Sequence, residues 1–120
     1  MEWLAREVSE EASRRGYEIG IEGDKLILKS AGSPLRVVVA KSGDTYLVRL
    51  ETSEDLGSRI EEIVSESDDP KGEVESLLDE ALVIVELLVK SINGKGLKVR
   101  RLTRDAILDV YDTLESIMEG

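Results

Sequence analysis

Apolar residues recur at helical spacing in four segments of the chain. In residues 2–15, Leu4, Val8 and Ala12 occupy every fourth position, which places them on one face of a helix. Gly16 follows as a residue suited to end a helix. The same spacing elsewhere predicts three further helices, at residues 55–64, 70–92 and 104–118.

Between the first two helices, apolar residues recur at every second position instead. Four such stretches predict β-strands with one buried face, at residues 17–22, 25–30, 35–41 and 45–51. Gly23-Asp24 and Gly43-Asp44 each provide a two-residue loop with glycine first, which suits a tight hairpin turn. We therefore expect two successive β-hairpins.

These two loops fix the register of both hairpins. Apolar residues then face one another in four pairs: Ile21 with Leu26, Ile19 with Leu28, Val39 with Val48, and Val37 with Leu50. On the opposite face of the second hairpin, Arg36 lies opposite Glu51 and Val38 lies opposite Arg49, as expected for a largely wetted surface. One face of the sheet is thus predicted to be buried and the other hydrated.

Residues 97–101 alternate again and predict a fifth strand, whose Lys and Arg side chains suit an exposed sheet edge. The elements then follow in the order α-β-β-β-β-α-α-β-α. With 120 residues and no linker-like segment, the chain is expected to form one domain, 1–120. We predict an α+β fold with an antiparallel meander sheet of four to five strands and helices packed mainly on one face.

The helix at 70–92 is the element around which the rest of the chain is expected to pack. Over residues 73–92 its apolar side chains fill an arc of roughly 220°, about twice what one sheet face requires. A strand over 81–85 is the alternative, because three of its residues are β-branched. As a helix, it needs two partners: the sheet, and either the C-terminal helix or a second subunit. The second interpretation predicts a homodimer with four contact residues: Leu82, Val83, Val85 and Val89.

Composition removes several classes of chemistry. The chain has no cysteine and no histidine, which excludes disulfides, zinc–thiolate sites and Ser-His or Cys-His nucleophiles. Its longest apolar run is five residues, 81–85, far below the ~20 that cross a bilayer. The charged N-terminus is unlike a signal peptide, so we expect no membrane contact and a cytoplasmic location. Glutamine is absent and Asn93 is the only side-chain amide, which predicts a heat-adapted, thermostable protein.

The net charge of −10 is segregated along the chain. Residues 51–80 hold twelve acids and two bases, residues 81–104 hold one acid and six bases, and residues 105–120 hold five acids and no base. A cluster of cations can bind the phosphates of a nucleic acid. The candidate residues are Lys95, Lys98, Arg100, Arg101 and Arg104. The alternative interpretation is that these cations pair with the acidic 51–80 region, within one chain or between chains.

A second candidate is the carboxylate group formed by Asp68, Asp69, Glu73 and Glu75. Clustered acids bind Mg²⁺ or Ca²⁺ through oxygen ligands, although the spacing of a calcium loop is not present. No metal site, cofactor or catalytic residue is predicted from this cluster. A carboxylate–metal-dependent enzyme is the weakest of the three functions considered.

These observations favour a non-enzymatic protein-interaction or adaptor module. Its expected partners are a second copy of itself and an unknown protein. The alternative is a nucleic-acid accessory protein that uses residues 95–104. The two functions differ in what charge reversal at Arg100 and Arg101 would do: it would abolish phosphate binding in one and disturb folding or assembly in the other.

Overall fold

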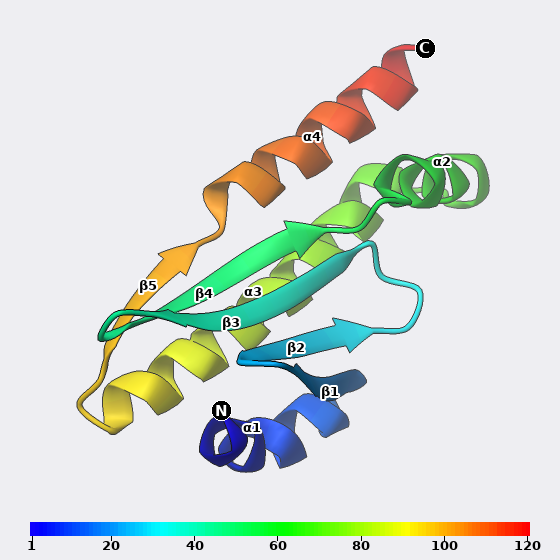
Figure 1. Cartoon of the computed structure of the whole chain (residues 1–120). Helices are drawn as coiled ribbons and strands as arrows, with labels where there is room; N and C mark the ends of the chain where they lie inside the picture. Colours follow the sequence, from blue (N-terminus) through cyan, green and yellow to red (C-terminus); the bar gives the residue numbers. More distant parts are fainter.

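The computed structural model describes residues 1–120 and contains four helices and five strands (Figure 1). The helices are α1 (Glu2–Arg14), α2 (Leu56–Glu66), α3 (Pro70–Gly94) and α4 (Arg104–Glu119). The strands are β1 (Tyr17–Glu22), β2 (Lys25–Ser30), β3 (Leu35–Ser42), β4 (Thr45–Thr52) and β5 (Lys98–Leu102). The predicted α+β class and element order are confirmed.

Both hairpins have the predicted register. Each of the four apolar pairs expected across β1–β2 and β3–β4 is present, as are the Arg36–Glu51 and Val38–Arg49 pairs. Gly23 and Gly43 adopt positive φ angles of 62° and 61°, a region that residues with a Cβ rarely enter. The Gly-Asp loops therefore set the register, because only glycine suits their first position.

β5 differs from a simple meander in its direction. The sheet order is β1-β2-β3-β4-β5, and the first four strands are antiparallel, as predicted. β5 instead runs parallel to β4. A parallel neighbour requires a long crossover connection. α2 and α3 together form it and return the chain to the end of the sheet at which β4 begins.

α3 lies across one face of the sheet and carries eight buried residues (Figure 1). It contacts β3, β4 and β5, and also α1, α2 and α4. Asp69 caps its first turn by accepting a hydrogen bond from the Gly72 N–H at 3.2 Å, and Pro70 occupies the first helical position, as predicted. Most of the wide apolar arc of α3 is therefore covered by partners within the chain.

Only one face of the sheet is covered by helices. Its fully buried side chains join α1 and α3 in a single core, and on the strands they are Leu26, Leu28, Val37, Val39 and Val48. Figure 1 shows the sheet in front of α3, with no helix over its near face. The predicted layering is confirmed, and one sheet face is left without a covering element. None of the four helices combines the length and hydrophobicity that crossing a bilayer requires.

Tyr17, at the start of β1, gives the fold a measurable pH dependence. Burial of the phenol and, secondarily, the Glu80 carboxylate raise the pKa of Tyr17 to about 12. In the unfolded chain a tyrosine ionises near its ordinary pKa of about 10. The contribution of Tyr17 to the stability of the fold is therefore fully present below that pH. It is lost as the pH rises through the raised pKa of Tyr17.

We predict that an ultraviolet titration of tyrosinate will show this late ionisation. Glu80→Gln should shift it toward lower pH, because the second cause of the raised pKa is removed, whereas Glu75→Gln should leave it in place. If Tyr17 ionised at its ordinary pKa, the packing of β1 against the core would be contradicted.

Candidate interaction surface

One face of the sheet is left open by the helices (Figure 1). Side chains alternate along a strand, so the observed register assigns each strand residue to one face. We call the uncovered surface the open sheet face. Its residues are Glu18, Gly20, Glu22, Lys25, Ile27, Lys29, Arg36, Val38, Ala40, Ser42, Thr45, Leu47, Arg49, Glu51, Lys98, Arg100 and Leu102.

The centre of this face is apolar. Val38 is only 6 % exposed although no helix covers it, and it is the one buried hydrophobic residue outside the main core. Ile27 and Arg49 flank it on the neighbouring strands. Ala40, Leu47 and Leu102 are half-buried around it. The open sheet face therefore presents an apolar centre that stays partly in contact with water.

Cations surround this apolar centre. The face carries six Lys or Arg against three Glu, a net charge of +3, so the remainder of the chain carries −13. Two of the cations are neutralised locally: Arg36 pairs with Glu51 at 2.9 Å and Lys98 with Asp44 at 3.0 Å. The other four are exposed and form no ion pair within the chain: Lys25, Lys29, Arg49 and Arg100.

The structure does not bring the five cations of the predicted basic segment 95–104 together on one surface. Lys95 lies 3.9 Å from Glu7 and over the Trp3 ring. Lys98 and Arg100 belong to the open sheet face, and Arg104 begins α4 without an ion pair. Where these cations form ion pairs within the chain, their partners Glu7, Asp44 and Glu86 lie outside residues 51–80. Pairing with the 51–80 region within one chain is therefore not present, and pairing between chains stays a prediction.

Arg101 points to the helical side of the sheet and binds Glu86 of α3. Its guanidinium donates two hydrogen bonds to the two carboxylate oxygens, at 2.6 and 2.7 Å. These bonds hold the pKa of Glu86 below its usual range and raise the pKa of Arg101. Arg101 therefore joins β5 to α3 and is already occupied, whereas its neighbour Arg100 is free on the other face.

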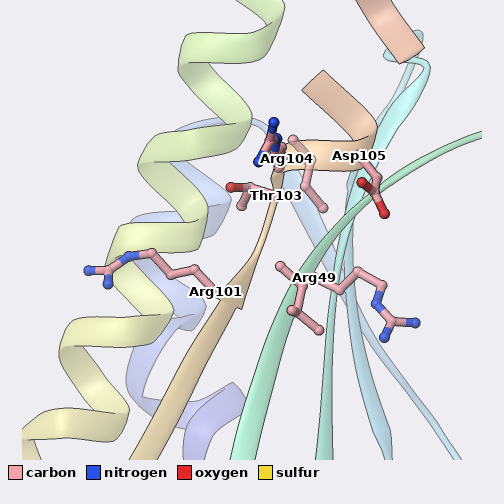
Figure 2. Close-up of a pocket in the computed structure, with 7 residues that line it drawn as sticks. Arg49, Arg101, Thr103, Arg104 and Asp105 are labelled. Carbon is pink, nitrogen blue, oxygen red and sulfur yellow. The ribbon is translucent and has the colours of Figure 1, made fainter. Parts of the chain in front are cut away.

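A hollow of about 570 Å³ extends the open sheet face where β5 ends and α4 begins. Figure 2 shows Arg49 and Asp105 pointing to the side away from α3, while Arg101 reaches across α3. Arg104 and Thr103 complete the polar lining. The lining therefore combines guanidiniums, a carboxylate and a hydroxyl.

The structure also places the four residues predicted to form a subunit interface on α3. Val85 and Val89 are 1 % and 2 % exposed and belong to the core, where a second subunit cannot reach them. Leu82 is half-buried against the same core. Val83 alone is substantially exposed, at 40 %. The homodimer stays a prediction, but α3 offers it little accessible apolar surface.

The carboxylates near the start of α3 do not form a metal site. The structure brings no three acidic side chains close enough to share a metal ion. Asp69 instead serves as the cap of α3. The idea of a carboxylate–metal enzyme thus receives no support from the arrangement of these residues.

Comparison of the chain with protein-family models, with curated proteins and with solved structures found no match. Sequence reasoning identified Arg100 and Lys98 but did not connect them with Lys29 and Arg49. The alternation of side chains along each strand indicates which of its residues share a face. Only the pairing of β4 with β5 shows that these residues lie on one common surface.

Proposed function

We propose that the chain is a non-enzymatic protein-interaction module that binds an acidic, partly apolar partner surface on its open sheet face. The observation that carries this proposal is a half-buried apolar centre surrounded by unpaired cations, on a face without a covering element. The apolar centre would provide binding free energy. The cations would steer an acidic partner and exclude a basic one.

The same observations favour a protein over a nucleic acid. A single strand is usually held by aromatic side chains on which its bases stack, but the open sheet face has none. Trp3 and Tyr46 lie edge to face, with ring centroids 6.1 Å apart, on the helical side of the sheet. A phosphate backbone would leave the apolar centre exposed to water.

The test is a fluorescence anisotropy titration with a labelled acidic amphipathic peptide that has glutamate and leucine at helical spacing. Single- and double-stranded oligonucleotides are titrated in parallel. The peptide should bind, and binding should weaken as salt is added. A sheet-reversed variant, Lys29→Glu/Arg49→Glu/Arg100→Glu, should weaken peptide binding by about tenfold or more, because attraction becomes repulsion.

The matched control changes the net charge equally at exposed cations outside the open sheet face. It is Arg6→Glu/Lys71→Glu/Lys90→Glu, on α1 and α3, where none of the three forms an ion pair. Its peptide binding should stay within about twofold of the unmodified chain, since distant exposed charges are screened. Equal weakening by both variants, or binding of oligonucleotides and not of the peptide, would overturn the proposal.

A further inference from the structure

α4 presents a surface whose chemistry is opposite to that of the open sheet face. Six exposed residues share one side of the helix and are here called the acidic α4 stripe: Asp105, Leu108, Asp109, Asp112, Glu115 and Glu119. None of its five carboxylates forms an ion pair within the chain. Leu108, 48 % exposed, lies among them. The stripe therefore combines a net charge of −5 with an exposed apolar residue.

We infer that the partner of the open sheet face is the acidic α4 stripe of a second copy of the chain. This inference rests on the proposed function and names its partner. Each chain carries a face of net charge +3 with an apolar centre and four cations that form no ion pair, and a stripe of net charge −5 with an exposed apolar residue. Contact between copies neutralises both surfaces and covers Leu108 together with the apolar centre of the sheet.

The start of the acidic α4 stripe lies on the same side of the molecule as the open sheet face (Figure 2). Asp105, the first residue of the stripe, points to the same side as Arg49 across the hollow at the end of β5 (Figure 2). α4 begins there and leads away from the sheet toward the C-terminus (Figure 1). A two-fold rotation that brings two copies face to face therefore sets each stripe on the other copy's sheet, and the assembly closes as a dimer.

The dimensions and charges agree with this reciprocal arrangement. α4 has 16 residues and is about 24 Å long, while five strands span about 19 Å. One helix can thus lie across the whole open sheet face. Contact of sheet with sheet would oppose two surfaces of charge +3, and contact of stripe with stripe would oppose two surfaces of charge −5. Only the reciprocal contact places opposite charges together on both sides of the axis.

Light scattering at micromolar concentration tests the inference through a charge exchange. The unmodified chain should have twice the mass of one 13.3 kDa chain. In the sheet-reversed variant the open face changes from +3 to −3 and repels the stripe. A helix-reversed variant, Asp109→Lys/Asp112→Lys/Glu115→Lys, changes the stripe from −5 to +1 and repels the face. Each variant alone should be monomeric, with the dissociation constant raised about 100-fold or more.

An equimolar mixture of the two variants should restore the dimer. In the mixed pair, one contact unites a reversed face with a reversed stripe and the other unites the two natural surfaces, so both are attractive. A folding defect cannot produce this rescue. Circular dichroism of each variant checks its fold, and the control variant described above should remain dimeric. A monomeric unmodified chain, or a mixture that stays monomeric, would overturn the inference.

The two proposals fail separately. If the chain were monomeric but the acidic peptide still bound in a manner sensitive to Arg49 and Arg100, the open sheet face would keep its proposed role and would take another acidic partner. If the chain dimerised but neither reversal changed its mass, the reciprocal contact would be wrong. If the acidic peptide also failed to bind the helix-reversed variant, whose natural sheet face is left uncovered, the proposed function would fail with it.

Discussion

Leu28→Asp should lower the free energy of unfolding by about 4 kcal/mol or more, whereas Ile27→Asp on the same strand should lower it by only about 1 kcal/mol. Leu28 is fully buried between β2 and the helices. A carboxylate there loses its hydration without a partner and costs about 4 kcal/mol or more, against a typical domain stability of about 5–15 kcal/mol. Ile27 lies on the open sheet face. Aspartate there costs about 1 kcal/mol, because it favours a β-strand less than isoleucine does.

Circular dichroism and urea unfolding of the two variants provide the measurement. The pair is well matched, because adjacent residues on one strand receive the same substitution and differ only in the face they occupy. Equal loss of stability would mean that both faces of the sheet are covered. In that case the surface on which the proposed function rests would not exist.

Leu88→Ala should lower the free energy of unfolding by about 2–5 kcal/mol, the range observed when a large buried side chain is truncated. Leu88 is fully buried on α3, within the core that joins this helix to the sheet. Val83→Ala on the exposed side of α3 should change it by about 0.5 kcal/mol or less. Urea unfolding with a common slope for both variants separates the two effects.

Val83 also distinguishes the two possible dimers. A contact through the apolar arc of α3, as the sequence suggested, would include Val83, and Val83→Glu would dissociate it. The reciprocal contact between α4 and the sheet leaves Val83 outside. We therefore expect Val83→Glu to keep the mass of the unmodified chain, and a change to monomer would favour the α3 interface.

The hairpins could be derived from the sequence because two local signals agree. Alternation assigns each strand residue to a face, and the Gly-Asp loops fix which residues are opposite. The direction of β5 could not be derived in the same way, since alternation is identical in parallel and antiparallel strands. It depends on the crossover through α2 and α3, which is a property of tertiary packing.

The candidate sites were harder to predict because closeness in sequence is a poor guide on a strand. Arg100 and Arg101 are neighbours in the chain but lie on opposite faces of β5, and Glu86 already binds Arg101. Arg49 joins Arg100 on one surface only through the β4–β5 pairing. For α3, a helical wheel counts apolar positions but cannot say which partner covers them. The structure shows that partners within the chain cover Val85 and Val89, which belong to the core.

The most direct test of the open sheet face is amide chemical-shift mapping on the isotope-labelled helix-reversed variant, which keeps the natural sheet. The probe is a peptide with the natural sequence of residues 104–119. We predict shift changes concentrated on the strands around Ile27, Val38, Leu47 and Leu102. Changes centred on α3 around Val83, or no changes with peptide in excess, would contradict the assignment of the open sheet face as the binding surface.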